Sequence, residues 1–471
     1  MGMDKNTVIG FVLIGALLIG MFVINSRSRL AYEGEQKRIA DSIAATKPKV
    51  DTAATAKDLR VTDSLLEAKQ KLPATFITDS AEHIDSLEND LLKIVFTNKG
   101  GQPKAVALKN FRDFKGMPII LEQGKFNRLS YAINTGNNQT KQTADITFVQ
   151  GNKVRNADGS QSLSFLLKDS SGQELTHQYT LAQGSYSVDL NISMKNADKL
   201  VSQNTINLLW QTETPQVERD IKYERQQSHI CYLADGDYDF EYVSSGDDKK
   251  FNKPVEWLAI KQQFFISALS AKNKFTNAYV KWTVPGDSSH VIAQTTANCN
   301  IQLPAGPVAA VPLQLYYGPS DYNVLKKYNN KMENIVPYGS GIFAFVKYIN
   351  RHFLLPVFDF LREHIASMGI VILLLTLLIR LITSPILYKS YLSGAKMKAL
   401  KPEIDRLKEK HGDDKQAFSM DQMKLWKSAG VSPLGGCLPA LLQIPIFMSL
   451  YYFFQSNISL RGQNFLWAKD L

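Results

Sequence analysis

The sequence holds few cysteines and none of the common enzyme motifs. Three of its 471 residues are cysteine (Cys231, Cys299 and Cys437), and no two of them form a CxxC pair. This excludes a disulfide-rich mini-domain and argues against a zinc ribbon or a thioredoxin-type site. The sequence also lacks GxSxG, HExxH, a P-loop and GxGxxG. We therefore predict a protein that is not an enzyme and that uses no metal or cofactor.

Long apolar runs are missing from the middle of the chain and concentrated at its two ends. The formal charge of +10 raises the question of nucleic acid. However, residues 389–427 carry ten basic and six acidic residues between two apolar segments. A short basic loop in that position is typical of a membrane topology signal. We therefore expect contact with membrane lipids and no specificity for nucleic acid.

The N-terminal segment 1–29 contains the apolar run TVIGFVLIGALLIGMFVI at residues 7–24. The run is longer than the core of a usual signal peptide, and no small-x-small cleavage site follows it. We interpret it as an uncleaved transmembrane anchor, with a cleaved signal peptide as the alternative. Residues 30–85 are rich in Ala, Lys, Thr, Asp and Glu. Such a composition buries little apolar surface and predicts a flexible tether.

Residues 86–335 alternate between apolar and polar positions. The pattern includes Leu92, Ile94 and Phe96, and it recurs around residues 186–194 and 278–284. A period of two with turn residues between the runs predicts half-buried antiparallel strands. Many short strands over this length favour a sandwich of two sheets, with some helix near residues 320–333.

The C-terminal part predicts helices in and beside a membrane. Residues 336–364 show basic and aromatic residues at helical spacing, which suits an interfacial amphipathic helix or, alternatively, a domain-packing helix. Residues 365–388 and 432–455 are each long and apolar enough to cross a bilayer. Residues 389–431 predict a helical hairpin between these spans, and residues 456–471 begin a further loop.

Charge fixes the expected topology. The basic hairpin should be cytoplasmic under the positive-inside rule, which places the β domain and the loop 456–471 outside. The anchor then has a cytoplasmic N-terminus. Arg27 and Arg29, which follow the anchor, are a weaker local signal in the opposite sense.

Arg380 is the only charged residue in the span 365–388. A mid-membrane arginine costs about 2.5–3.5 kcal/mol on insertion scales, so it usually faces water or a partner. Thr376 lies one turn earlier and places a hydroxyl on the same face. These two residues predict a wet cavity for polar or acidic groups. The alternative is a structural arginine that snorkels to lipid headgroups.

The last span is interrupted by prolines at 433, 439 and 445, and Gln443 adds a side-chain amide. Proline in a membrane helix frees carbonyl groups that neighbours or water must satisfy. This pattern predicts a helix that lines a cavity or packs closely on another helix; simple kinked packing is the alternative.

The stretch from VILLLTLLIRLITSPILYKSYLSGAKMKALKPEIDRLKEKHGDDKQ to SPLGGCLPALLQIPIFMSLYYFF closely resembles the core of the YidC/Oxa/Alb membrane-insertase family. WLAIKQQFFISAL and LQLYYGPSDYNVLKKY are similar to that family's periplasmic domain. The resemblance implies a multi-domain protein of the bacterial inner membrane. Its α-helical transmembrane core would carry a periplasmic all-β domain of the supersandwich type, whose relatives bind sugars.

The resemblance further implies a chaperone that inserts and folds integral membrane proteins, alone or with the Sec translocon and the ribosome. Arg380 and Thr376 would lie in a hydrophilic groove open to the cytoplasm. Clients would slide along the third span, at Cys437, Leu438, Pro439, Gln443, Ile444 and Pro445.

Family cores have five spans after the periplasmic region, so the resemblance also predicts an incomplete core that ends after the third transmembrane span. Two other classes of function remain open. One is a transporter that binds an anionic substrate at Arg380. The other is a membrane-tethered glycan-binding protein built around residues 86–330. No internal repeat of broken helices supports the transporter.

Overall fold

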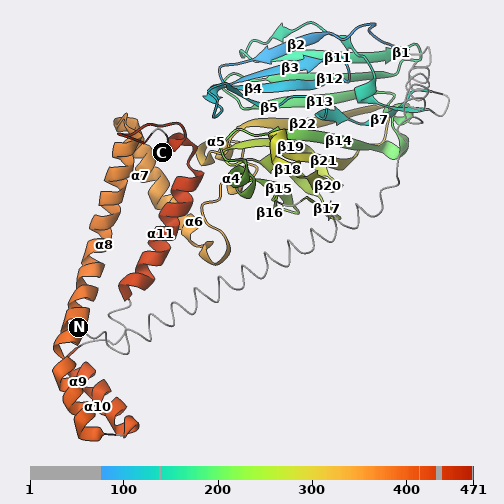
Figure 1. Ribbon diagram of the computed structural model, residues 1–471. Helices are drawn as coiled ribbons and strands as arrows, with labels where there is room; N and C mark the ends of the chain where they lie inside the picture. The colour runs from blue at the N-terminus through green and yellow to red at the C-terminus, as the bar shows by residue number, and fades with distance from the viewer. Residues whose placement is uncertain are drawn as a thin grey trace, which may run out of the picture. The chain divides into compact units, whose positions relative to one another are not determined.

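The structure is a computed structural model that describes residues 76–471, apart from 137–138, 245, 413, 431–437, 469 and 471 (Figure 1). The predicted anchor at 7–24 and nearly all of the predicted tether at 30–85 lie outside the described residues. Cys437 lies outside them as well.

The largest sheet has eleven antiparallel strands in the described part of the chain. Its main order is β1-β11-β12-β13-β22-β19-β18-β15-β16, and β9 and β10 also pair with β11. The bounds of these strands are β1 (Phe76–Ile77), β9 (Val149–Gln150), β10 (Val154–Arg155), β11 (Gln161–Asp169), β12 (Glu174–Leu181), β13 (Ser187–Lys195), β15 (His229–Ala234), β16 (Asp237–Tyr242), β18 (Val255–Lys261), β19 (Phe265–Phe275) and β22 (Val308–Pro319).

Two smaller antiparallel sheets and a short hairpin complete the β domain. One sheet has the order β2-β3-β4-β5, the other β17-β20-β21-β14-β6, and β7 pairs with β8. Their bounds are β2 (Ile84–Glu88), β3 (Leu92–Thr97), β4 (Gln102–Arg112), β5 (Pro118–Glu122), β6 (Arg128–Ser130), β7 (Ala132–Asn134), β8 (Thr140–Gln142), β14 (Thr205–Pro215), β17 (Asp247–Phe251), β20 (Asn277–Thr283) and β21 (Val291–Gln302).

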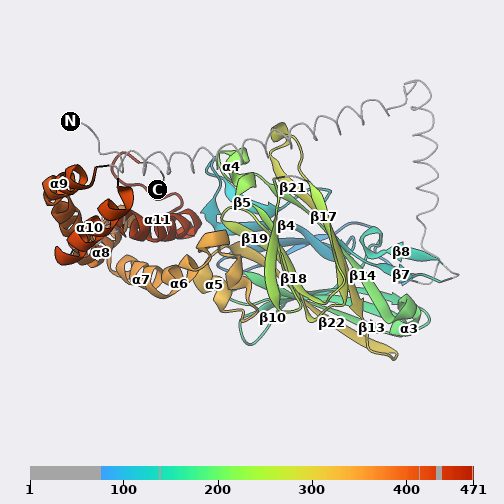
Figure 2. The ribbon, with the colours of Figure 1, turned by 90° about the horizontal axis from the view of Figure 1, so that it is seen from below.

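The sheets lie against one another in the β domain (Figure 2) and enclose a core of aromatic and aliphatic side chains. The Phe96 ring of β3 lies 4.5 Å from the Tyr179 ring of β12, and Phe111 of β4 lies 5.2 Å from Phe265 of β19. The small sheets thus pack on the large one as a sandwich. The predicted alternation is confirmed in β3, β13 and β20, where inward residues such as Phe96 and Trp282 are buried.

Short helices close the β domain and lead out of it. They are α3 (Ala197–Leu200), α4 (Ile221–Gln226), α5 (Tyr322–Lys326) and four 3-10 turns, η1 (Thr143–Asp145), η2 (Ser202–Asn204), η3 (Asp287–Ser289) and η4 (Met332–Ile335). Asp321 starts α5, because its carboxylate accepts a hydrogen bond from the Val324 backbone N–H at 3.0 Å. The helix expected near residues 320–333 is therefore present, as two short pieces.

The C-terminal part of the chain is helical. Its elements are η5 (Gly341–Phe343), α6 (Val346–Ile349), the π-helical turn η6 (Asn350–Leu354), α7 (Leu355–His364), α8 (Met368–Ala399), α9 (Lys401–His411), α10 (Lys415–Ser428), α11 (Leu438–Ser456) and η8 (Ile458–Leu460). Pro356 lies in the first turn of α7. Because proline has no N–H to donate, the widened turn just before it is a natural place for a π-bulge.

Helix boundaries differ from the sequence-based expectation in two places. The helix of the second span begins at Met368, because Ile365 has extended backbone angles and ends α7. It then continues to Ala399, well past residue 388, and Leu400 separates it from α9. The first residues of the segment predicted as a hairpin, 389–431, therefore belong to α8.

Glu122, at the end of β5, is a buried carboxyl group in the sandwich. Its side chain is 4% exposed and interacts with the side chains of Tyr317 and Trp210. Burial raises the pKa of Glu122 from 4.5 to about 7, because a carboxylate loses its hydration there, and these two donors oppose the rise. The neutral acid is therefore the form that the fold accommodates best.

This gives the first prediction. A carboxyl group whose pKa is raised in the folded state makes its whole contribution to the free energy of unfolding below pH 4.5. That contribution is lost as the pH rises through about 7. The side chain introduced by Glu122→Gln is neutral at every pH. The substitution should therefore abolish this change in the free energy of unfolding with pH, which amounts to at most about 3 kcal/mol. Thermal unfolding of the full chain, followed by tryptophan fluorescence at pH 5 and pH 8, measures it. An equal pH dependence in the variant and the parent would contradict the assignment.

Candidate functional site

Helix α8 carries one buried stripe and is otherwise open. Val371, Leu375, Ile379 and Thr383 are buried and lie four residues apart, so they share one face that drifts slowly around the helix. Among the described residues, the window Met368–Pro385 is the one helix long and apolar enough to cross a membrane, with a mean hydropathy of 2.1. The stripe packs towards α7 and α11 and leaves the remaining faces exposed.

Arg380 and Thr376 lie on an exposed face of α8, one turn apart. The Thr376 hydroxyl donates to the Ile372 backbone carbonyl at 2.8 Å. The Arg380 guanidinium makes no hydrogen bond or ion pair with any residue that the structure describes, whereas its backbone carbonyl accepts a hydrogen bond from the Thr383 hydroxyl at 3.2 Å. At 1.5 Å per residue it lies roughly 18 Å along the helix from Met368. The structure therefore puts an unpaired cation well inside the apolar helix.

Helix α11 holds the residues expected to contact a client. Leu438 and Pro439 lie in its first turn. Ile444 is 49% exposed, whereas Gln443 and Pro445 are partly buried. Among the described side chains, none of Gln443, Ile444 and Pro445 is in hydrogen-bond contact with Arg380 or Thr376.

A buried polar contact joins α11 to the π-turn η6. The Ser449 hydroxyl donates to the Asn350 side-chain oxygen at 2.6 Å, and the Asn350 amide donates to the Tyr338 carbonyl at 2.8 Å. All three residues are buried. A hydrogen-bonded polar pair in an apolar setting fixes how α11 lies along η6, because separating the pair would leave two buried polar groups without partners. Asn350 and Ser449 are polar residues in largely apolar segments, and no local pattern pairs them.

Aromatic packing supports the same junction. The Phe453 ring of α11 stacks 6.0 Å from Tyr338 and meets Phe358 of α7 edge-on at 5.3 Å. Phe465 packs against Gly369 at the start of α8, where a Cβ atom would overlap its ring. Helices α7, α8 and α11 are thus held together at the end where α8 begins.

The other end of α8 carries the hairpin of α9 and α10. Asp414 starts α10 by accepting from the Gln416 and Ala417 backbone N–H groups at 3.1 and 3.0 Å. His411 of α9 contacts Asp421 of α10 at 3.0 Å. Lys424 and His411 lower the pKa of Asp421, so its carboxylate stays ionised and bridges the two helices.

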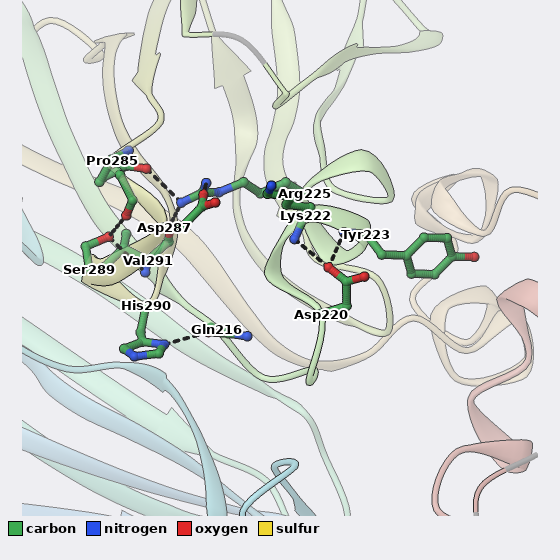
Figure 3. A network of polar contacts seen from close by, with 11 residues as sticks. Gln216, Asp220, Lys222, Tyr223, Arg225, Pro285, Asp287, Ser289, His290 and Val291 are labelled. Carbon is green, nitrogen blue, oxygen red and sulfur yellow. Dashed lines mark hydrogen bonds and ion pairs between the residues drawn. The ribbon is translucent and has the colours of Figure 1, made fainter.

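Helix α4 is held to the β domain by a polar network (Figure 3). It contacts α11 separately, through Tyr223. Arg225 donates to the Pro285 and Val291 carbonyls at 2.7 and 2.6 Å and pairs with Asp287. Tyr223 of the same helix points away from this network, and its hydroxyl accepts from the Gln455 amide of α11 at 2.9 Å. The buried arginine thereby fixes the helix that presents Tyr223.

A second link is an ion pair that sequence reasoning missed. Arg461, just after η8, donates to Glu218 of the β domain at 2.6 Å, and its guanidinium lies 5.3 Å from the Phe265 ring centre. Burial raises the pKa of Glu218, and the Arg461 charge opposes that rise. The pairing joins residues 243 positions apart, so no local pattern could reveal it.

The described residues offer little covalent chemistry. Cys231 and Cys299 are buried, and burial raises the pKa of the Cys231 thiol to about 12. A thiol with such a pKa is a poor nucleophile at neutral pH. No group of three or more metal-ligating side chains forms among the residues that were described.

Known proteins match both parts of the chain. Residues 86–350 match the family model "YidC periplasmic domain", and residues 360–471 match the family model "60Kd inner membrane protein". The membrane protein insertase YidC of Phocaeicola vulgatus is 32% identical over 488 residues, covering 100% of this chain and 76% of that protein. The same-named protein of Bacteroides fragilis is 32% identical over 483 residues, with the same two coverages.

One solved structure covers most of the chain. It is described as an active YidC insertase crystal structure with the first transmembrane domain resolved. It covers 89% of this chain and 83% of its own, at 16% identity and a TM-score of 0.30.

The Arg461–Glu218 pair gives the second prediction. Arg461→Gln leaves the Glu218 carboxylate partly buried without its cation, which should lower the local opening free energy of residues 457–465 by about 2–3 kcal/mol. Amide hydrogen exchange of the full chain measures this loss of protection. Glu218→Gln combined with Arg461→Gln should recover part of it, and full protection in the single variant would contradict the role of the pair.

Proposed function

The chain belongs to the YidC family of membrane protein insertases, and from this premise we propose how its membrane helices handle a client. Family membership makes it a non-enzymatic protein of the bacterial inner membrane with a periplasmic β domain. Its clients are nascent membrane proteins. The proposal concerns the route that a client takes along α8 and α11.

Arg380 is the single observation that carries the proposal. It is exposed on an apolar helix and has no partner among the described residues. Leaving it in hydrocarbon would cost about 2.5–3.5 kcal/mol, so water or an anion must meet it. A wet groove at this depth lowers the desolvation cost for an incoming polar tail. An acidic tail gains a further attraction there, because water is partly excluded.

Helix α11 supplies the exit side of this route. Ile444 and Phe447 are exposed on it. A client's apolar segment would pack on this face and pass sideways into lipid, since its transfer from a wet groove to hydrocarbon is favourable. Cys437, Leu438, Pro439, Gln443 and Pro445 belong to the same proposed contact surface.

The topology completes the proposal. The basic hairpin α9–α10 faces the cytoplasm, where positive loops are retained, and the protein crosses the membrane several times with a cytoplasmic N-terminus. This places the hairpin where a ribosome delivers a chain. It also leaves the membrane helices free to work beside the Sec translocon.

The third prediction tests the charge. Arg380→Ala should reduce insertion of a client with an acidic translocated tail about tenfold, the loss of a contact worth about 1.4 kcal/mol. Arg380→Lys should keep most of the yield, and a client with a neutral tail should be much less affected. Protease protection of the client tail in vesicles containing each variant measures the yield.

The matched control is Arg155→Ala, which removes the same side chain from an exposed strand of the β domain. Insertion at the parental level by Arg380→Ala would contradict the groove charge. Uptake of an anionic solute that depends on Arg380, with insertion unchanged, would instead support a transporter.

A further inference from the structure

A pocket of about 340 Å³ lies where the β domain meets the interfacial helices and α11. It is lined by β15 and β16, by the segment 334–340, by α6 and η6, and by α11. Aromatic and amide side chains dominate its wall, among them His229, Tyr238, Phe240, Tyr242, Tyr451 and Tyr452. This volume has room for roughly ten water molecules, enough for a small polar group.

Two cations enter this pocket without an acidic partner. Lys347 of α6 and Arg351 of η6 both line it, one turn apart, and no aspartate or glutamate does. The Arg351 Nη2 atom donates to the Asn334 side chain at 3.0 Å, whereas its buried Nε atom has no acceptor among the described residues. Lys347 makes no ion pair there. Two positive side chains in one pocket whose lining includes no carboxylate favour an anionic ligand.

The helices beneath the pocket present apolar rings on another face. Phe345, Tyr348, Ile349 and Phe353 are all exposed and recur at helical spacing. Tyrosine and phenylalanine with flanking lysine or arginine are typical of the headgroup region of a bilayer. An interfacial position of these helices would put the two cations at the depth of lipid phosphates.

A second depression of about 520 Å³ adjoins the pocket and shares Tyr451 and Gln455 with it. Its other lining residues include Phe264, Phe447, Leu450 and Phe454. A polar pocket with two cations thus continues directly into an apolar trough along α11. Such a pair of surfaces matches an amphiphilic anion better than a free inorganic ion.

We propose that the cation pocket at Lys347 and Arg351 binds the phosphate headgroup of an anionic phospholipid, whose acyl chain lies in the trough along Phe447 and Phe454. Lys347 and Arg351 hold the phosphate oxygens. The lipid then fills the junction between the β domain and α11 and stiffens it. This site is separate from Arg380, but its trough shares Phe447 with the face proposed for clients.

The test uses the full chain in phosphatidylcholine nanodiscs with a trace of phosphatidylglycerol that carries a photoreactive group on its acyl chain. After irradiation, labelled peptides are identified by mass spectrometry. We expect labelling within residues 447–455. Lys347→Gln with Arg351→Gln should reduce that labelling at least tenfold, and Lys347→Arg should retain it.

Three controls keep the result specific. Lys326→Gln with Lys327→Gln removes two exposed charges at the end of α5 and should leave the labelling unchanged. A photoreactive diacylglycerol with the same acyl chain should label weakly, because it lacks the phosphate. Lys347→Gln alone repeats the test at a residue whose side chain has no described hydrogen bond, in case the Arg351 variant does not fold.

Equal labelling of the parent and the Lys347 and Arg351 variants would overturn the proposal. Equal labelling by the diacylglycerol probe would do so too, since it would reduce the site to an apolar trough. Loss of the lipid label on adding millimolar inorganic phosphate would assign the pocket to a free anion instead. Loss of the label on adding an acidic peptide would assign it to a protein segment.

Discussion

An arginine on an apolar helix imposes the constraint on which the functional account depends. Arg380 needs water or an anion near it, so the helices around it cannot close completely. Helix α8 therefore packs through one narrow stripe, from Val371 to Thr383, and leaves its other faces open. An open helix needs support from elsewhere, and the structure supplies it at the end that begins at Met368. There Phe453, Phe358 and Phe465 lock α7, α8 and α11 together.

The β domain takes part in that support. Tyr223 reaches Gln455, and Arg461 reaches Glu218, so both the end of α11 and the segment after it are tied to the sandwich. The Asn350–Ser449 contact fixes α11 against the interfacial helices in between. These links are polar, partly buried and far apart in sequence. They hold α11 and the segment after it in place while Ile444 and Phe447 stay exposed, which is compatible with the proposed client route.

The sequence predicted much of the fold because its periodicities are strong. Alternation at Leu92, Ile94 and Phe96 required a strand, and the apolar run around Arg380 required a spanning helix. The helix boundaries were predicted less accurately, because the break at Ile365 and the turn at Leu400 depend on backbone angles that composition does not determine. The pairings of Arg461 and Asn350 could not be found, because each joins segments brought together only by the folded chain. The roles of Arg380, Thr376 and the α11 residues came from a single charge and from resemblance, and they remain predictions.

The most direct measurement is a site-specific photo-crosslink from position 444 of α11 to a ribosome-bound client in native membrane vesicles. The account predicts a strong adduct with the client's apolar segment. It also predicts that Arg380→Ala lowers the adduct several-fold, whereas Arg155→Ala does not. An adduct of equal strength in all three proteins would contradict the claim that the arginine captures the client, and no adduct with any client would contradict the route along α11.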